Sequence, residues 1–277
     1  MPSSLGVIGL GRMAQAILFP LLEIGEVLPN EVFGVVGQKD SVQPLKEQLP
    51  SGVIVLSSDD PKSFEVWRMP VQLLAIKPQQ LDALDRSINQ NKSLISTPTP
   101  RPLLISLLAG VTLQRLKRSF PNHSLVRAVP NTPALVGAGI TGLAWGEEIP
   151  TDQKLLVKRL FSPISEVLEL PEDQLDAFLA LTSSGPAYIA LIAEALADGA
   201  VAAGLPRVLA NYLSHRTLYG TSLLLKEKEL HPGQLKDMVT SPGGTTITAL
   251  RHLEKGGLRS ALMEAVVAAA ERSRELS

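Results

Sequence analysis

The segment Gly9-Leu10-Gly11-Arg12-Met13-Ala14 constrains the fold of this chain more than any other. It follows a short apolar run at residues 5 to 8, and apolar residues then recur at helical spacing until Gly25. Its pattern is the G-x-G-x-x-A form of the dinucleotide-binding fingerprint, which requires a strand before it and a helix after it. The first glycine permits a tight turn, the second lets backbone approach a pyrophosphate, and the alanine keeps the helix close to the strand.

The alternation of strand and helix continues along the N-terminal part of the chain. Further apolar runs lie at residues 32 to 36, 53 to 56, 71 to 76, 103 to 108 and 125 to 129, separated by segments of helical length. Strands that alternate with helices imply right-handed crossovers and a parallel, doubly wound α/β sheet. We therefore expect a Rossmann-type domain over residues 1–170.

After Leu170-Pro171 the pattern becomes rich in Ala and Leu, and we expect an all-helical second domain over residues 171–277. Its helices are predicted at 186–204, 206–227, 245–255 and 258–275. The first of them carries a stripe of small residues that permits close helix approach, at Ala190, Ala193, Ala197, Ala200 and Gly204. We expect this stripe to face a second copy of the chain, which predicts a homo-oligomer with the dimer as its minimum unit.

The composition removes several classes of function. A net charge of -1, with only three Tyr and two Trp, does not suggest a nucleic-acid surface. The chain has no cysteine and its four histidines lack ligand spacing, so no metal site is predicted. Charges such as Glu194, Asp198 and Glu264 interrupt the apolar stretches before the ~20 residues that a membrane span needs. The cytoplasm is the expected location.

The end of the second apolar run bears on the choice of cofactor. NAD-binding domains normally place a carboxylate there to bind the ribose 2′-OH, whereas this chain has Gly37-Gln38-Lys39. Gln38 and Lys39 can hold a 2′-phosphate, so NADPH is favoured. Asp40 leaves NADH open, because a shift of two residues would bring its carboxylate to the ribose.

Several motifs, in order along almost the whole chain, resemble those of the pyrroline-5-carboxylate reductases. Besides the glycine turn, they are Ala75-Ile76-Lys77-Pro78-Gln79, Leu108-Ala109-Gly110-Val111-Thr112, Pro130-Asn131-Thr132-Pro133-Ala134, Ser184-Gly185-Pro186-Ala187-Tyr188, His231-Pro232-Gly233-Gln234-Leu235-Lys236-Asp237 and Ser241-Pro242-Gly243-Gly244-Thr245-Thr246. The resemblance implies NADPH-dependent reduction of 1-pyrroline-5-carboxylate to L-proline, the last step of proline biosynthesis. It also implies a helical domain that interlocks with a second subunit.

The resemblance extends to particular residues. It implies that the cofactor lies along Gly9, Gly11, Arg12, Met13, Gln38, Lys39, Lys77, Pro78, Ala109 and Asn131. Arg12 departs from the pattern, since the family is expected to have a small or amide residue there. The family's substrate-contacting threonine corresponds to Thr246, and Glu229 matches a position near the substrate where a carboxylate can stabilise an iminium.

The loop of Ser241, Gly243, Gly244, Thr245 and Thr246 also has a physical reading of its own. Two glycines before a helix leave unpaired N–H groups at a positive helix end, which suits the substrate carboxylate. Thr246 can then direct its hydroxyl to the imine nitrogen, with Ser241 as a further donor. The alternative without a function is that the loop is an ordinary helix cap. For Glu229, it is a solvated charge at a helix end.

Three other functions stay open. A 3-hydroxyacid-type dehydrogenase shares the domain order, but it needs a general base on the first long helix, and residues 186–204 contain no Lys or His. A reductase of another cyclic imine is chemically close. A non-catalytic regulatory protein that binds NADPH would keep the glycine turn but have little use for the loop at 241–246.

Overall fold

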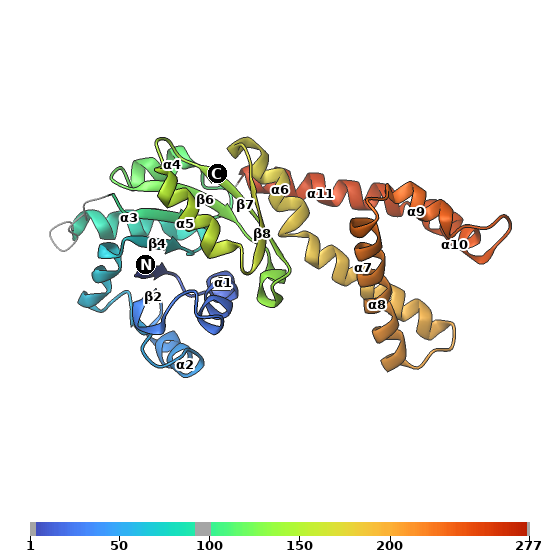
Figure 1. Cartoon of the computed structure of the whole chain (residues 1–277), viewed down its shortest axis with the longest axis horizontal. Helices are drawn as coiled ribbons and strands as arrows, with labels where there is room; N and C mark the ends of the chain where they lie inside the picture. The colour runs from blue at the N-terminus through green and yellow to red at the C-terminus, as the bar shows by residue number, and fades with distance from the viewer. Residues whose placement is uncertain (1–3, 92–100, 276–277) are drawn as a thin grey trace. The chain divides into compact units, whose positions relative to one another are not determined.

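The computed structural model describes residues 4–91 and 101–275 (Figure 1). The chain forms two compact units. The first combines the chain up to Ser183 with the chain from Ala269 onward, and the second comprises Ser184–Ala268. The boundary expected at Leu170-Pro171 stays a prediction. Each unit has its own architecture.

The first unit is built on an eight-stranded sheet with the order β3-β2-β1-β4-β5-β6-β7-β8. The strands are β1 (Leu5–Ile8), β2 (Val32–Val36), β3 (Ile54–Ser57), β4 (Val71–Leu74), β5 (Leu103–Ser106), β6 (Ser124–Val129), β7 (Gly139–Trp145) and β8 (Ser165–Glu169). The first six strands are parallel, and the chain reverses its direction of progress between β1 and β4. In an open sheet of this kind, ligands bind outside the carboxyl ends of the strands at such a switch point.

The sheet departs from the expected parallel arrangement at β7, a strand that the sequence did not predict. This strand pairs antiparallel with β6, with Val126 opposite Trp145, and β8 then pairs parallel with β7. Between β6 and β7 the chain makes only a tight connection that contains the 3₁₀ turn η6 (Thr132–Val136). A parallel neighbour would need a crossover of a dozen or more residues.

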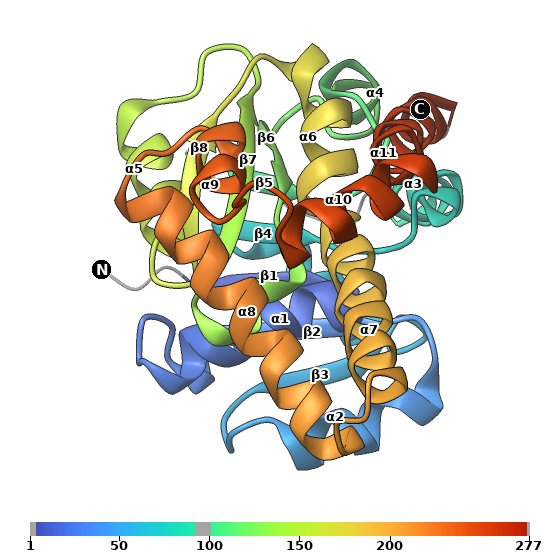
Figure 2. The same cartoon turned by 90° about the vertical axis from the view of Figure 1, so that its right-hand side faces the viewer.

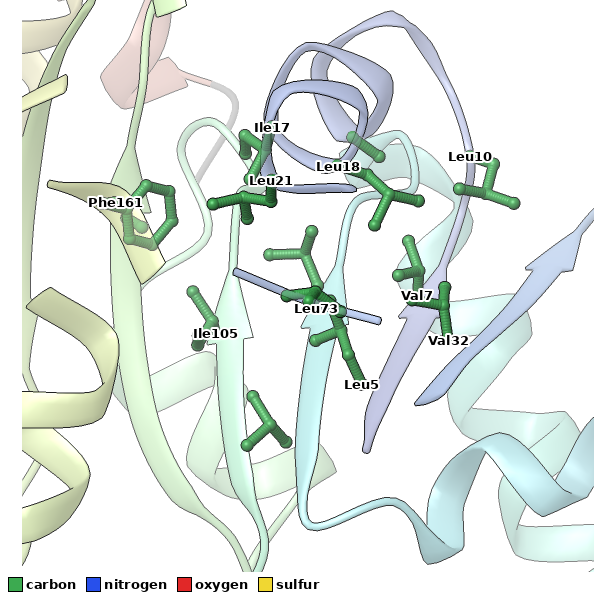
Figure 3. Close-up of a cluster of buried hydrophobic side chains, with 14 of the residues drawn as sticks. Leu5, Val7, Leu10, Ile17, Leu18, Leu21, Val32, Leu73, Ile105 and Phe161 are labelled. Carbon is green, nitrogen blue, oxygen red and sulfur yellow. The ribbon is translucent and has the colours of Figure 1, made fainter. Parts of the chain in front are cut away.

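Helices cover both faces of the sheet, as the doubly wound prediction requires. One core cluster packs α1 (Arg12–Glu23), α2 (Val42–Gln48) and α5 (Thr151–Phe161) on one face, with Leu18 and Phe161 fully buried (Figure 3). The other packs α3 (Leu81–Gln90), α4 (Leu113–Ser119) and the 3₁₀ segment η3 (Pro61–Arg68) on the opposite face. The remaining 3₁₀ turns are η1 (Pro29–Glu31), η2 (Lys39–Ser41), η4 (Pro78–Gln80) and η7 (Glu172–Gln174).

A further helix, α6 (Leu175–Thr182), packs over β6 and β7. A Cβ at Gly142 would lie 2.9 Å from the ring of Phe178 on α6, so only glycine allows this helix to approach the strand. The last turns of α11 (Leu258–Glu275) belong to the same unit, and Ser273 donates to Asp176 at 2.6 Å.

The second unit is helical. It consists of α7 (Gly185–Ala202), α8 (Arg207–Glu227), α9 (Pro232–Met238), α10 (Thr245–Lys255) and the first part of α11. Helices α7 and α8 pack as a hairpin, and Gly204 between them has the left-handed φ of +103° expected of a helix-terminating glycine (Figure 2). The short helix α9 was not predicted. It begins after His231, whose Nδ1 accepts from Gly233 N at 3.1 Å, so the conspicuous His-Pro-Gly-Gln motif is a helix cap.

The small-residue stripe does not face a second copy at its centre. Ala193 and Ala197 are 8% and 2% exposed, because α8 of the same chain packs against them. That part of the sequence expectation was wrong, and Ala193 and Ala197 serve the α7–α8 hairpin.

Large apolar side chains are exposed on other faces of the second unit. They include Ile189, Leu191, Leu196, Val208, Tyr212, Tyr219, Leu223, Ile247, Met263 and Val267. Within the described residues, one helical stretch, Glu172–Ala202, is also long and apolar enough to cross a membrane, and little of it is buried in the chain. The core helix of a soluble protein passes the same test, so one such stretch is weak evidence for a membrane.

Candidate dinucleotide and substrate sites

The cofactor residues predicted from sequence gather at one edge of the sheet. Five segments lie directly beyond the carboxyl ends of the parallel strands β1, β2, β4, β5 and β6: the glycine turn, Gln38-Lys39, Lys77-Pro78, Ala109 and Asn131. Parallel strands that share register bring such segments to a common edge, on both sides of the switch point. Their individual roles toward a cofactor stay predictions.

The glycine turn has the conformation that the fingerprint needs. Gly9 has a φ of +94°, and a Cβ there would lie 2.7 Å from the carbonyl oxygen of Ala75, so two strand ends meet at this residue. Gly11 precedes α1 without a side-chain cap, and a Cβ at Gly11 would meet nothing within 4 Å. The first N–H groups of α1 therefore face open space, where a pyrophosphate fits.

The end of β2 is open and polar. Gln38 and Lys39 are exposed, and Asp40 lies beside them in the turn η2. Arg12, the first residue of α1, is also exposed. No ion pair within the described residues occupies Lys39 or Arg12, so both charges are available to an anion.

The segments after β4 and β5 are held by local contacts. Lys77 N donates to Gln80 Oε1 at 3.0 Å, and Pro78 begins the turn η4, while the Lys77 side chain stays exposed. Ala109 is half-buried and precedes Gly110, which has a φ of +75°. Both segments thus keep a fixed backbone at the sheet edge.

Asn131 behaves differently from the other predicted cofactor residues. Its side chain is buried, Oδ1 accepts from Ile140 N at 2.9 Å, and Nδ2 donates to the carbonyl oxygen of Thr182 at 3.1 Å. Next to it, Ser183 Oγ donates to the carbonyl oxygen of Pro130 at 2.9 Å. Sequence reasoning missed Thr182 and Ser183, since nothing local marks them as partners of a loop some 50 residues away.

The predicted substrate loop is a tight turn that opens onto α10. Gly244 N donates to the carbonyl oxygen of Ser241 at 3.1 Å, with Pro242 and Gly243 between them, and Gly243 has a φ of +68°. These are the features of a type II turn, with proline and glycine at its two central positions. A Cβ at Gly244 would lie 2.3 Å from Ser241 Oγ and 3.2 Å from the Ser241 carbonyl oxygen, so a larger residue there would force the Ser241 side chain to move.

The helix start after this turn is uncapped. Gly244 is the N-cap and supplies no side chain, so the first N–H groups of α10 have no intrahelical partner. Thr246 is half-buried, and its hydroxyl has no hydrogen bond within the described residues, whereas Thr248 Oγ1 bonds back to the carbonyl oxygen of Gly244. These N–H groups and the Thr246 hydroxyl are the polar groups that the sequence predicts for a carboxylate and an imine nitrogen, and their roles toward a substrate stay predictions.

Glu229 ends α8 in a left-handed conformation, with a φ of 49°. Leu230 N donates to the carbonyl oxygen of Leu225, and Glu229 N to that of Lys226, which is the pattern of a Schellman helix end. Glycine is usual at this position, so Glu229 occupies a backbone site that its side chain does not favour.

A cavity of about 560 Å³ lies away from these residues, between α4, β6 and the segment Trp145–Glu147. None of the predicted cofactor or substrate residues lines it. Within residues 4–91 and 101–275 no group of three His, Asp or Glu side chains forms a metal site.

The strand order, the uncovered glycine turn and the open end of β2 define an NADP-binding oxidoreductase domain. Residues 4–100 match the family model described as NADP oxidoreductase, coenzyme F420-dependent. Residues 172–276 match the model described as pyrroline-5-carboxylate reductase dimerisation.

Relatives match over the full length. The chain is 47% identical over 276 residues to a pyrroline-5-carboxylate reductase of Synechocystis, covering 100% of this chain and 99% of the relative. It is 40% identical to that of Glycine max, over 99% of this chain and 96% of the relative. The pyrroline-5-carboxylate reductase of Coxiella burnetii has a TM-score of 0.81 at 35% identity, with 100% and 99% covered. The Plasmodium falciparum enzyme with NADP bound has a TM-score of 0.85 at 28% identity, with 99% and 98% covered.

The chain therefore belongs to the pyrroline-5-carboxylate reductase family, and it is an NAD(P)H-dependent oxidoreductase of that family. Its C-terminal part is a dimerisation domain.

Proposed function

We propose that this chain reduces 1-pyrroline-5-carboxylate to L-proline and that it prefers NADPH over NADH. The observation that carries the substrate assignment is the turn Ser241–Gly244, which opens onto the uncapped start of α10 beside the unpartnered Thr246 hydroxyl. When bound, NADPH supplies a hydride. Hydride adds to the imine carbon, the C=N π electrons move to the nitrogen, and a nitrogen that is already protonated becomes the amine of proline.

The residues of the chain mainly bind and orient in this reaction. A protonated imine carries its own positive charge, so no strong acid is needed, and positioning is the larger contribution. The N–H groups at the start of α10 bind the substrate carboxylate at the positive end of the helix. Thr246 accepts a hydrogen bond from the imine N–H through its hydroxyl oxygen, and Ser241 supplies a further polar group beside the carboxylate. Glu229 stabilises the iminium charge.

The preference for NADPH rests on the end of β2. Gln38 and Lys39 are exposed beyond that strand, where an NAD-specific domain has a carboxylate. The Lys39 ammonium pairs with a 2′-phosphate, and exposed Arg12 at the start of α1 adds a second cation. Lys39→Glu should therefore weaken NADPH binding and leave NADH binding nearly unchanged, and Lys46→Glu on α2 is the matched control. A wild-type protein that prefers NADH, and that loses this preference on Asp40→Asn, would show that Asp40 binds the ribose instead.

We further propose that the functional unit is a homodimer. In the second unit the buried hydrophobic residues are Ala193, Ala197, Ala210 and Leu235, which is a small core for five helices. Its exposed apolar faces need a cover, because large contiguous apolar patches mark interfaces. Val208→Asp, at a residue that is 84% exposed on α8, should shift the protein toward monomer in light scattering, whereas Leu155→Asp on α5 should not. An active monomer at assay concentration would contradict the dimer.

The decisive experiment compares cyclic imines as substrates. The purified protein should oxidise NADPH with 1-pyrroline-5-carboxylate and much more slowly with a six-membered cyclic imine carboxylate. Equal rates would favour a broader imine reductase. Tight NADPH binding without turnover of either imine would favour a regulatory protein, and turnover of a 3-hydroxyacid with NADP⁺ would favour the dehydrogenase alternative.

We place this activity in the cytoplasm, with a small-molecule substrate and without nucleic acid or a membrane as partner. The balanced charge and the absence of cysteine support this assignment.

A further inference from the structure

Hydrogen bonds of Asn131 and Ser183 connect the end of α6 to the carboxyl edge of the sheet. Asn131 follows β6 directly and is 6% exposed, so its amide is inside the first unit and not at its surface. Its two polar atoms join three segments, because Oδ1 accepts from β7 at Ile140 N and Nδ2 donates to the Thr182 carbonyl oxygen at the end of α6. Ser183 Oγ repeats the connection through the Pro130 carbonyl oxygen.

These bonds lie where the chain leaves the first unit. That unit ends at Ser183, and α7 begins at Gly185. An isolated hydrogen bond from Thr182 Oγ1 to Phe178 holds only the local helical turn, whereas Asn131 and Ser183 tie the same residues to the sheet. Two side chains therefore tie the last residues of the first unit, just before α7, to the carboxyl edge of its sheet.

We infer that Asn131 is a positioning residue for the reduction, which acts through Thr182 and Ser183 on the start of α7. This inference rests on the proposed function, in which α10 of the helical unit holds the substrate. Helix α7 begins two residues after Ser183, so the loss of these hydrogen bonds would free the chain at the start of α7. A misplacement of about 1 Å between reacting groups can cost a hundred-fold in rate.

The amide geometry makes a selective test possible. Asn131→Asp keeps the acceptor for Ile140 N but replaces the donor with a carboxylate oxygen that faces the Thr182 carbonyl. Asn122→Asp is the matched control, because Asn122 is exposed and lies two residues before the start of β6, at the opposite end of the strand from Asn131. Ser183→Ala removes the second bond without a charge change, and it stands in for Asn131→Asp if that variant does not fold.

Four quantities are measured on the full-length protein: the dissociation constant of NADPH, kcat, the KM for the imine, and hydrogen exchange of the first-turn amides of α7. We expect Asn131→Asp to lower kcat about ten-fold, to leave NADPH affinity within about two-fold, and to speed exchange at Ala187, whose N–H donates to the Ser184 carbonyl oxygen in the first turn of α7, while Asn122→Asp changes none of these. Ser183→Ala should move kcat and exchange in the same direction by less.

Two results would overturn the inference. If NADPH affinity falls as much as kcat/KM, Asn131 contacts the cofactor through its side chain. If thermal stability falls while kcat stays at the wild-type level, the bonds are structural only. The exchange measurement needs no substrate, so it tests the hydrogen bonds of Asn131 whether or not the protein is active. A wild-type protein that is inactive on 1-pyrroline-5-carboxylate would refute the proposed function, which is a different result from unchanged exchange in Asn131→Asp.

Discussion

Ser214 Oγ on α8 donates a 2.7 Å hydrogen bond to the main-chain carbonyl oxygen of Ala193 on α7. Both residues are buried, and the bond closes over a helix face on which Ala197 is also buried. A hydroxyl can reach a carbonyl that is already within a helix only where no larger side chain separates the two backbones. Ala193 and Ala197 are therefore used within the chain, at the contact between α7 and α8.

The first prediction concerns this contact. Ala197→Leu should reduce the free energy of unfolding by about 1 to 3 kcal/mol, because three additional side-chain carbons do not fit between α7 and α8. Ala190→Leu is the matched control on the same helix, since Ala190 is exposed. Urea denaturation of both variants measures the difference. Equal stability of the two would mean that the hairpin can open without cost.

The second prediction concerns His123. Burial beside Trp67 and Phe120, together with the smaller effect of the Lys117 charge, lowers the pKa of His123 from 6.5 to about 4. The neutral ring is therefore favoured in the folded protein, and between pH 6.5 and 4 only the unfolded chain takes up the proton. Stability from this residue is complete above about pH 6.5 and is lost as the pH falls toward 4, by up to about 3 kcal/mol.

Urea denaturation at pH 7.5 and pH 5 tests this sign. His123→Phe keeps an aromatic ring in the cluster and should lose less stability at pH 5 than the wild type. His252→Phe, at an exposed position on α10, should keep the wild-type pH dependence. A wild type and His123→Phe that lose the same amount would show that His123 is accessible to protons in the folded state.

The strands of the cofactor domain were predictable because burial on both faces makes them continuous apolar runs. All five residues of β2 are buried, and β1 and β4 follow the same rule. The strand β7 was missed, since its sequence contains two glycines that weaken any local strand pattern. The space at both glycines is limited by residues far away in the sequence. A Cβ at Gly139 would meet Ser165 Oγ at 2.5 Å, and Gly142 lies against Phe178.

The position of the candidate cofactor residues along the sheet edge was predictable in the same way, while their roles stay predictions. Residues that follow strands could be placed at one edge, because topology alone brings them together. The partners of Asn131 could not, since Thr182 is 51 residues away and its carbonyl has no sequence signature. The helix α9 has seven residues, too few for an apolar period, and a histidine is an unusual N-cap.

The third prediction concerns Thr246. Thr246→Ala should reduce turnover of 1-pyrroline-5-carboxylate by roughly two-fold to a hundred-fold, the range for one hydrogen bond to a neutral or charged partner. NADPH binding should change little, since the predicted cofactor segments lie in the other unit. Thr246→Ser keeps the hydroxyl and should recover most of the rate. Steady-state rates and a fluorescence titration of NADPH measure both effects.

Two outcomes would count against Thr246 as a substrate contact. If Thr246→Ala matches the wild type, the hydroxyl is only part of a helix start. If the alanine and serine variants are equally slow, the methyl group and its packing matter and the hydroxyl does not.

The fourth prediction sets stability against activity at Glu229. A non-glycine residue with a left-handed φ of 49° costs about 1 kcal/mol or more relative to glycine, although glycine also gains entropy in the unfolded chain. Glu229→Gly should therefore leave stability unchanged or raise it by up to about 1 kcal/mol. If the carboxylate stabilises the iminium, the same change should lower turnover, and Glu229→Gln should lower it equally without relieving the backbone. Thermal unfolding and steady-state rates of the two variants separate these effects, with Glu227→Gln on the last turn of α8 as the control for a nearby surface charge. If both Glu229 variants lose turnover and Glu227→Gln does not, the effect belongs to the Glu229 carboxylate. Full turnover in both Glu229 variants would make Glu229 a helix end without a role in the reaction.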